Sequence, residues 1–324
     1  MKLPTADDVH AAQSRIADHI VRTPMLRSPL LDAETEATVL IKAEPLQRTG
    51  SFKLRGATNA LLRLSPEERA RGVVTYSSGN HGQAISCAAA SLGMRATVVM
   101  PADAPAIKRD STARWGAEII SYDRATEDRE AIGRAAVERS GAVLIPPFDH
   151  PDVIAGQGTL ALELAADAKA AGLALDALLV CTGGGGLTAG CALALSSVSP
   201  ATAVFAVEPE GWDDTARSLR AGTRLANDGS GSGLCDALMS PMPGMLTFEI
   251  NRRLLAGALV VSNDAVMRAM GFALSHLKLV VEPGGAVALA AILARSFAAK
   301  GKVVGIVLSG GNADPTALTQ ALAK

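Results

Sequence analysis

The segment that decides the fold reads Ala177-Leu178-Leu179-Val180-Cys181-Thr182-Gly183-Gly184-Gly185-Gly186-Leu187. Its five apolar residues predict a buried β-strand, and the alanine-rich stretch that begins at Leu187 predicts a helix. Glycines at a helix start leave the free backbone amides open to a ligand, and the helix dipole favours negative charge there. The segment therefore predicts an α/β fold with a phosphate-binding loop, although a tight strand-to-helix turn is the alternative.

Strands and helices alternate along the rest of the chain. We expect strands at 37–43, 73–76, 96–100, 118–122, 142–145, 177–181, 203–207 and 303–308. We expect helices at 6–21, 52–64, 82–92, 106–115, 126–140, 156–171, 187–196, 263–277 and 286–298. This alternation predicts two doubly wound units, each a parallel sheet covered by helices on both faces. Residues 221–247 have no periodicity, and a connection of this length is often functional.

A second loop has the same layout as the glycine loop. Ser77-Ser78-Gly79-Asn80-His81-Gly82 lies between an expected strand and an expected helix. Its hydroxyls and amides, at a helix N-terminus, favour the binding of a carboxylate. An ordinary capped turn is the alternative, and a single histidine in such a loop is more often structural than catalytic.

A lysine is set between apolar residues in Ser51-Phe52-Lys53-Leu54-Arg55-Gly56-Ala57. Ser51 is a plausible N-cap, which would place Lys53 in the first turn of a helix. A lysine taken alone is usually a solvated surface residue. Together with the two loops and with Ser309-Gly310-Gly311-Asn312, it indicates a site for a phosphorylated aldehyde cofactor with Lys53 as the covalent anchor. The glycine loop matches neither the dinucleotide nor the nucleotide-triphosphate pattern.

The composition excludes several classes of function. Hydrophobic residues make up 48% of the 324 residues and charged residues 19%, without the run of roughly 18 apolar residues that a membrane span requires. The 31 basic and 32 acidic residues give a net charge of -1 with no basic block, so neither nucleic acid nor membrane is an expected partner. The four cysteines show no disulfide or zinc pattern and the N-terminus shows no export signal, so we expect a cytoplasmic protein.

Six segments resemble, in order, the motifs of fold-type II pyridoxal-phosphate enzymes, in particular the serine/threonine dehydratase and serine racemase family. The segments are Ser51–Ala57, Ser77–Ala84, Val153–Thr159, Thr182–Leu187, Glu282-Pro283 and Ser309–Asn312. The resemblance implies a tryptophan synthase β-like fold of two doubly wound open sheets. Residues 1–65 and 146–324 would form the large cofactor domain, and residues 66–145 a smaller mobile domain that closes on the substrate. We also expect a homodimer.

The resemblance implies roles for single residues. Lys53 would hold pyridoxal 5'-phosphate as a Schiff base and, once released, act as the base at the substrate Cα. Phe52 would pack against the cofactor ring. The other cofactor contacts would come from Asn80 at the ring 3'-oxygen, Ser309 at the pyridine nitrogen, Gly183, Gly184, Gly185, Gly186 and Leu187 at the phosphate, and Glu282. A serine at the pyridine nitrogen favours prompt β-elimination over a long-lived carbanion.

The substrate would lie on the loop that contains Ser77, Ser78, Asn80 and His81. Ser78 would be catalytic, on the ring face opposite Lys53; serine racemases use such a serine to exchange a proton, and dehydratases can also carry it. Arg129 matches a position near the substrate in serine racemase and could assist an acidic substrate. In the charged run Asp128-Arg129-Glu130 it would otherwise be a surface residue.

The resemblance also implies a cation site. Its ligands would be Glu208, the backbone carbonyl of Trp212 and Asp214, and oxygen ligands of this kind suit Mg²⁺ or Ca²⁺. Trp212 stands where the family has a small residue, and a loop of solvated acids is the alternative.

The late loop departs from the family pattern. Gly231-Ser232-Gly233 stands where many relatives have Ala-Asp-Gly, and the loop continues as an apolar stretch to Met239. We take this as a sign of a larger or different substrate.

The expected function is a PLP-dependent ammonia-lyase (dehydratase). By β-elimination it would convert a 3-hydroxy amino acid, L-threonine or L-serine by default, to a 2-oxo acid and ammonia. The alternatives are an amino acid (serine) racemase and a dehydratase specific for hydroxyaspartate, phenylserine or another 3-hydroxy amino acid. A cofactor-binding protein without turnover is a further alternative, which the presence of Lys53 disfavours.

Overall fold

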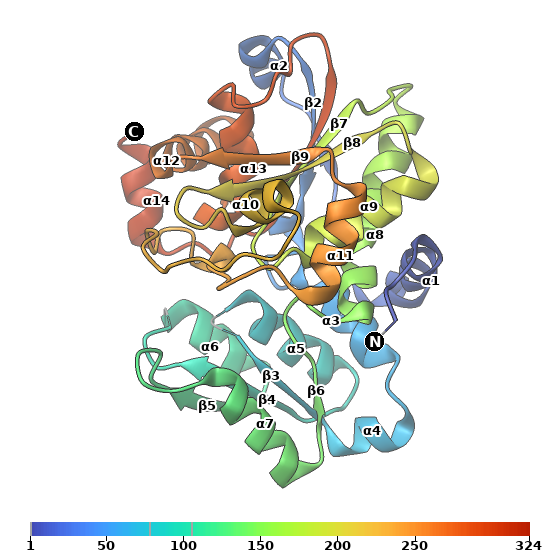
Figure 1. Cartoon of the computed structure of the whole chain (residues 1–324), viewed down its shortest axis with the longest axis vertical. Coiled ribbons are helices and arrows are strands. Elements are labelled where there is room, and N and C mark those ends of the chain that lie inside the picture. Colours follow the sequence, from blue (N-terminus) through green and yellow to red (C-terminus); the bar gives the residue numbers. More distant parts are fainter. Residues whose placement is uncertain (1, 78, 105) are drawn as a thin grey trace.

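The chain folds into two lobes, each built on one sheet (Figure 1). The computed structural model describes residues 2–77, 79–104 and 106–324. The larger lobe has a six-stranded sheet in the order β1-β2-β10-β7-β8-β9, and the smaller lobe has a four-stranded sheet in the order β5-β4-β3-β6. Neighbouring strands are parallel except for β1 and β2. The α/β fold with two sheets is confirmed.

The elements of the larger lobe come from both ends of the chain. Its strands are β1 Met25–Leu26, β2 Thr38–Ala43, β7 Ala177–Cys181, β8 Ala203–Pro209, β9 Gly257–Val261 and β10 Val303–Leu308. Its helices are α1 Ala6–Ile16, α2 Pro29–Thr35, α3 Lys53–Leu62, α8 Pro151–Ala170, α9 Gly186–Val198, α10 Asp214–Ala221, α11 Met245–Leu254, α12 Asn263–Phe272, α13 Pro283–Leu293 and α14 Pro315–Leu322. Short helices occupy Ala17–His19, Glu44–Leu46, Asp236–Leu238 and Ala273–Leu277.

The smaller lobe is continuous in sequence. Its strands are β3 Val73–Tyr76, β4 Ala96–Pro101, β5 Glu118–Tyr122 and β6 Val143–Leu144, and its helices are α4 Pro66–Arg71, α5 Asn80–Ser91, α6 Ala106–Arg114 and α7 Arg129–Ser140. Helix α3 packs against both α8 and α5 and so links the two lobes. The domain boundaries at 65/66 and 145/146, and the mobility of the smaller domain, stay predictions.

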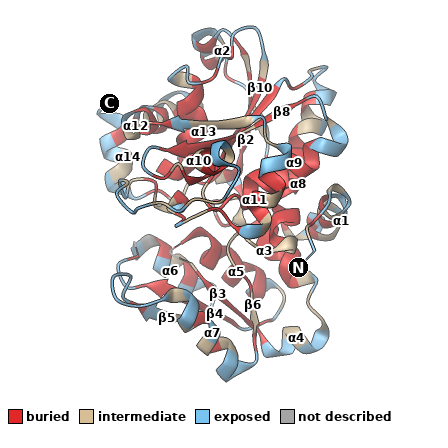
Figure 2. Ribbon diagram, viewed as in Figure 1, coloured by how far each residue is buried: buried red, intermediate tan, exposed pale blue. Residues whose placement is uncertain are grey.

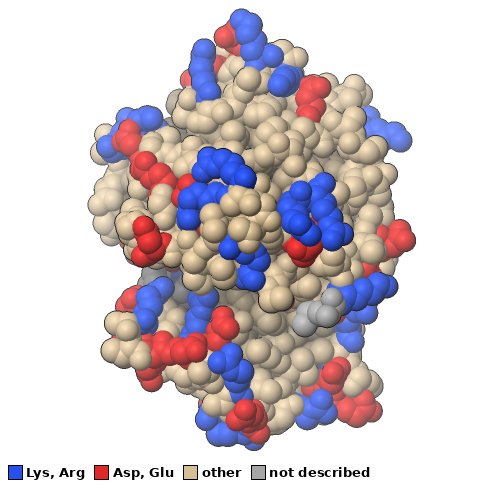
Figure 3. All heavy atoms as spheres, in the orientation of Figure 1, with Lys and Arg blue, Asp and Glu red and all other residues tan. Residues whose placement is uncertain are grey.

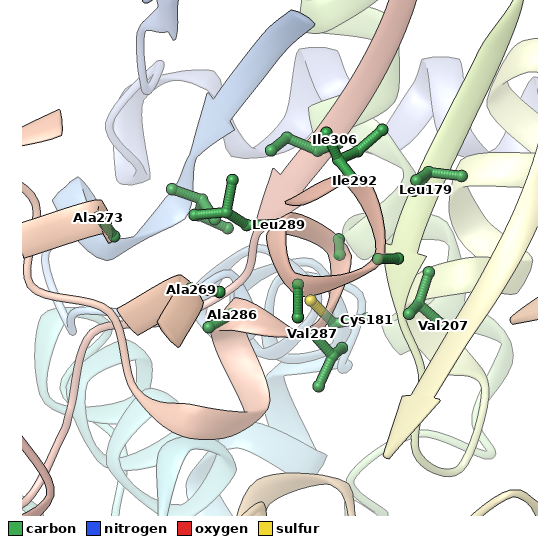
Figure 4. Packing of buried hydrophobic residues seen from close by; sticks show 14 of the residues in the cluster. Leu179, Cys181, Val207, Ala269, Ala273, Ala286, Val287, Leu289, Ile292 and Ile306 are labelled. Atoms are coloured by element: carbon green, nitrogen blue, oxygen red, sulfur yellow. The ribbon is translucent and has the colours of Figure 1, made fainter. Parts of the chain in front are cut away.

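The core of the larger lobe lies on both faces of its sheet, because alternate residues of a strand point to opposite sides. Leu179, Cys181 and Ile306 pack against α13 on one face (Figure 4). Leu178 and Val180 pack against α8 and α9 on the other face. Figure 2 shows the central strands, α8, α9 and α13 as buried. A sheet covered in this way leaves the ends of its strands as the place for a site.

Most of the predicted helices and strands are present, but several begin or end at other residues than predicted. The strands at 118–122, 177–181 and 303–308 agree with the structure, whereas α8 begins at Pro151, α7 at Arg129 and α13 at Pro283. The prediction missed β1, β9, α2, α4, α10, α11 and α14. Most of these are short, and β9 is a partly exposed edge strand without a continuous buried run.

The predicted N-cap of α3 is wrong. Phe52, not Ser51, precedes the first helical residue, and no side chain caps this helix. Ser51 instead forms a β-bridge with Gly310, and the Phe52 amide donates to the Ser309 carbonyl oxygen at 3.0 Å. Contacts with the last motif of the chain therefore fix the entry to the helix.

The surface shows no segregation of charge on the face drawn in Figure 3, where acidic and basic side chains are interspersed. None of the helices in the described ranges is long and apolar enough to cross a membrane.

Candidate active site

One cavity collects the predicted cofactor and substrate residues. It lies where β3, β7 and β10 end and the loops that follow them begin. Its lining includes Phe52, Lys53, Ser77, Asn80, His81, Arg129, Gly183, Gly184, Gly185, Gly186, Leu187, Glu282 and Ser309. The remaining predicted residue, Ser78, lies outside the described residues. Five of the six motifs, far apart in sequence, thus meet at one place, whereas Val153–Thr159 contacts α3 outside the cavity lining.

Lys53 is the first residue of α3 and reaches into this cavity. Its amine donates a hydrogen bond to the Pro147 carbonyl oxygen at 2.8 Å, and it lies 5.2 Å from the centre of the Phe52 ring. Burial lowers the pKa of Lys53 to about 8, although the Glu282 carboxylate acts in the opposite direction. The neutral, nucleophilic fraction of this amine near neutral pH is therefore well above that of a solvated lysine.

The glycine loop forms another wall of the cavity. Gly185, with a φ of +89°, is the N-cap of α9, so the first amides of this helix, which have no partner inside it, face this end of the cavity. A Cβ at Gly184 would lie 2.5 Å from the Phe148 ring, and one at Gly186 would lie 2.9 Å from the Phe148 carbonyl oxygen. Thr247 of α11 donates to the Gly184 carbonyl oxygen at 2.7 Å. Only glycine fits this cradle, and the cradle suits an anion.

The loop after β3 supplies a third wall. Helix α5 begins at Asn80, whose side-chain amide donates to Glu282 at 2.5 Å and accepts from Asn312 at 2.8 Å. His81 is buried and makes a 3.2 Å hydrogen bond with the Ile145 carbonyl oxygen. Burial, with a contribution from Lys53, lowers the pKa of His81 to about 3. His81 is therefore neutral and suited to a hydrogen bond rather than to an ion pair.

The cavity contains residues that the sequence did not single out. Lys108 of α6 forms an ion pair of 2.7 Å with Asp236 and lies 3.6 Å from Glu282, so it joins the smaller lobe to the larger one. Tyr76, Pro147 and Phe148 also line the cavity. Lys108 occurs in a polar helix with a weak apolar pattern, and nothing in its local sequence distinguishes it from a surface lysine.

Arg129, at the start of α7, also lines the cavity. Its guanidinium lies 5.5 Å from the centre of the Tyr76 ring. The neighbouring acids, Asp128 and Glu130, lie within 3.8 Å and 3.9 Å of Arg134 instead, and no carboxylate in the described part of the chain pairs with Arg129. It is thus a cation available to a ligand.

The predicted cation ligands are close together but are arranged differently from a complete site. Glu208 accepts hydrogen bonds from the Thr215 and Ala216 amides of α10, at 2.9 Å and 2.8 Å. Burial, with Asp214 nearby, raises the pKa of Glu208 to about 8. One Asp214 oxygen, Oδ2, is buried and has no hydrogen-bond partner among the described residues. Among the residues that the structure describes, no group of three or more His, Cys, Asp or Glu side chains is placed to hold a metal ion.

The altered late loop has a structural explanation. The Trp212 indole donates to the Ser232 carbonyl oxygen at 2.8 Å, and a Cβ at Gly231 would lie 2.4 Å from the Trp212 Nε1. Gly231 and Ser232 are not in the lining of the site cavity, whereas Asp236 to Ser240 are. The two departures from the family pattern, Trp212 and Gly231-Ser232-Gly233, are therefore one packing change. That the late loop reports a larger or different substrate stays a prediction.

A buried amine with a lowered pKa and an anion cradle in the same cavity define a site for a cofactor that carries both an aldehyde and a phosphate. The glycine cradle and the free first-turn amides fit that group. The family model described as "Pyridoxal-phosphate dependent enzyme" matches residues 16–310. The chain belongs to this family, and it is a PLP-dependent lyase.

Several individual proteins are similar to this chain over nearly its whole length. The chain is 46% identical to the L-threo-3-hydroxyaspartate ammonia-lyase of Pseudomonas sp, over 97% of each chain. It is 45% identical to the L-threo-3-hydroxyaspartate ammonia-lyase of Saccharomyces cerevisiae, over 97% of this chain and 95% of the relative. Among solved structures, maize serine racemase is similar, with a TM-score of 0.93, 37% identity, and coverage of 99% of this chain and 98% of the other.

Proposed function

We propose that this chain is an ammonia-lyase that acts on 3-hydroxyaspartate and releases a 2-oxo acid and ammonia. The observation that carries this proposal is Arg129, a cation on the cavity wall without a carboxylate partner among the described residues. A substrate with a second carboxylate would supply that partner. The two relatives named above for 3-hydroxyaspartate support the same substrate. The default expectation of threonine or serine receives less support and gives way to one of its stated alternatives.

The cofactor contacts that we propose follow the walls of the cavity. Lys53 would hold the aldehyde carbon, with Phe52 against the ring. Gly183 to Gly186 and Leu187 would bind the phosphate, and Ser309 would meet the ring nitrogen. Asn80 would reach the ring oxygen, and Glu282, which accepts its hydrogen bond, would fix its orientation.

The reaction that we propose relies on Lys53 as the base. Bound pyridoxal phosphate supplies the electron sink that makes the substrate α-proton acidic. The neutral Lys53 amine takes this proton, and the β-hydroxyl then leaves with a proton as water. The resulting enamine takes up water, so the net products are a 2-oxo acid and ammonia.

Substrate recognition would divide between two walls. Ser77 and the first turn of α5 would hold the α-carboxylate at a helix N-terminus, with neutral His81 beside it. Arg129 would hold the distal carboxylate. Because a guanidinium binds a carboxylate through two parallel hydrogen bonds, it would favour 3-hydroxyaspartate over serine or threonine.

The cation site is also part of the proposal. Two carboxylates, Glu208 and Asp214, are buried near each other, and Asp214 has an oxygen without a donor among the described residues. Mg²⁺ or Ca²⁺ would supply the missing positive charge, with the Trp212 carbonyl as a further ligand. Its role would be to support the fold around α10, since the cavity lining does not include these residues.

The test is a substrate panel with the purified holoenzyme. L-threo-3-hydroxyaspartate, its erythro isomer, L-serine and L-threonine are each incubated with the enzyme, and the 2-oxo acid, ammonia and D-amino acid are measured. We expect the highest kcat/KM with a 3-hydroxyaspartate isomer. Equal or higher kcat/KM values with serine or threonine would contradict the proposal that Arg129 binds a distal carboxylate.

Racemisation is the second candidate, favoured by the similarity to maize serine racemase. If the enzyme forms D-serine from L-serine without any 2-oxo acid, its activity on serine is racemisation and not elimination.

A further inference from the structure

Four charged side chains form a buried network behind the site. Lys42, Glu44 and Arg55 are 0% exposed and Glu163 is 4% exposed. Arg55 makes a fork with Glu44, with Nε to Oε2 and Nη2 to Oε1 both at 2.9 Å. A second fork joins Arg55 to Glu163, at 2.8 Å and 2.9 Å. Lys42 completes the network through Glu163 and the Thr23 carbonyl oxygen, both at 2.6 Å.

The network joins β2, the short helix Glu44–Leu46 and α8 to the first turn of α3. Glu44 follows β2, Glu163 lies in α8, and Arg55 is the third residue of α3. Thr159 of α8 adds a 3.2 Å contact to the same guanidinium. Because Arg55 has partners on two sides and all five of its donors point in fixed directions, it has little freedom to shift.

Stability alone is a weak explanation for such a network. A buried ion pair is weak support for stability, since well-packed apolar side chains often do as well. Burial alone would lower the pKa of Arg55, but Glu44 and Glu163 raise it overall, so Arg55 stays charged. Two positive and two negative side chains cancel, and the network therefore adds no net charge near Lys53. Its distinctive property is its geometry.

That geometry bears directly on Lys53. Lys53 and Arg55 are two residues apart in one helical turn, so their side chains leave the helix in directions about 200° apart. Arg55 is held on the core side and Lys53 enters the cavity on the other. No side chain caps α3, and a Cβ at Gly156 would lie 2.6 Å from the Gly56 Cα, so α8 touches the backbone of this turn.

We propose that Arg55 is a positioning residue, which fixes the first turn of α3 through its forks to Glu44 and Glu163 and so sets the direction in which the Lys53 amine points. This inference rests on the role of Lys53 in the proposed function. The forks add directional contacts, which an apolar replacement would not supply, to the backbone contacts of Ser51 and Phe52 at the entry to the helix.

The experiment compares Arg55→Lys with Lys42→Met. Arg55→Lys keeps the charge and loses both forks. Lys42→Met also disturbs Glu163 but leaves the Arg55 forks in place. Two readouts report on Lys53 itself: the pH midpoint of the visible band of the bound cofactor, and the rate at which Lys53 of the apoprotein is acetylated by acetic anhydride, measured by mass spectrometry.

We expect Arg55→Lys to move both readouts and to lower kcat by roughly 10- to 100-fold with KM little changed, because a misplaced reacting group slows the chemistry. Lys42→Met should lower the melting temperature but leave both Lys53 readouts at the wild-type value. Wild-type readouts in Arg55→Lys, or equal changes in the two variants, would overturn the proposal.

A charge-balanced double variant covers the case in which Arg55→Lys does not fold. Lys42→Met with Glu163→Gln removes one charge of each sign and one Arg55 fork, and it should change the Lys53 readouts where Lys42→Met alone does not. The acetylation rate needs neither cofactor nor substrate. It therefore still decides the role of Arg55 if the wild-type enzyme fails to act on 3-hydroxyaspartate, a result that would count against the proposed function alone.

Discussion

The amine of Lys53 and the carbonyl oxygen of Pro147 are joined by a hydrogen bond of 2.8 Å. Lys53 begins α3, after which the chain enters the smaller lobe, and Pro147 lies on the segment that returns from β6 to α8. The amine is thus held where the two connections between the lobes meet. A movement of one lobe against the other would therefore reach this amine directly.

Replacing Lys53 by alanine should abolish both cofactor attachment and turnover, because the other lysine that lines the cavity, Lys108, is paired with Asp236 and Glu282. Borohydride treatment followed by peptide mass mapping would detect the linkage, and 2-oxo acid formation would report turnover. Lys169→Ala, which removes an exposed lysine of α8, is the control and should behave as wild type. A residual reducible linkage in Lys53→Ala would place the anchor elsewhere.

Cofactor uptake by the apoprotein should depend on pH in a way set by Lys53. Burial lowers the pKa of this amine to about 8, and only the neutral amine adds to an aldehyde. The initial rate of uptake, followed by visible absorption, should therefore rise with increasing pH and reach half its plateau near pH 8. A rate that still rises steeply above pH 9.5 would mean that Lys53 titrates like a solvated lysine.

Arg129→Gln should affect substrates unequally. Removing a hydrogen bond to a charged group costs about 1.5–3 kcal/mol, which corresponds to a loss of roughly 10- to 150-fold in kcat/KM with 3-hydroxyaspartate. Activity on L-serine, which has no distal carboxylate, should change by less than about threefold. Arg134→Gln, in the same helix and exposed, is the matched control. Equal losses on both substrates would show that Arg129 does not bind the distal carboxylate.

Gly184→Ala should weaken cofactor binding. The added Cβ would lie 2.5 Å from the Phe148 ring, so either the loop or the ring must move out of the cradle. Equilibrium dialysis with pyridoxal phosphate should show at least a tenfold higher dissociation constant. Gly233→Ala places its Cβ in open space and should bind normally; equal binding by both variants would contradict a phosphate site at the glycine loop.

Mg²⁺ or Ca²⁺ should raise the melting temperature of the wild-type protein, because a ligand that binds only the folded state stabilises it. Asp214→Asn should remove this increase, since it takes away the charge of an oxygen that lacks a donor among the described residues. Asp213→Asn, one residue earlier, should keep it. An equal increase in all three proteins would exclude Asp214 as a ligand.

The sequence alone was enough to predict most residues that line the cavity, but not the contacts that hold them in place. Lys53, the glycine loop and Ser309 could be found because each lies in a short motif of consecutive residues that can be recognised from the sequence alone. Lys108 and Asp236 could not, because their pairing depends on how the two lobes meet, and no local pattern encodes that. Trp212 and Gly231 were read as two separate departures, and only their contact shows that a large indole requires a glycine opposite it.

The ends of elements were predicted less well for a related reason. Ser51 has the side chain of an N-cap, yet its backbone pairs with Gly310 near the other end of the sequence. The preference of serine for the N-cap position was overridden here by a tertiary contact of its backbone.

Strand β10 lies between β2 and β7 in the larger sheet. On the ribosome, all strands of the smaller lobe, which lie between residues 73 and 144, are made before β10. The larger sheet must keep a gap in its middle until residue 308 is made, and at about 5–20 residues per second that is on the order of tens of seconds after β2. A nascent chain that stalls before Val303 would therefore display two unpaired strand edges, those of β2 and β7, and it would be a natural client for a chaperone.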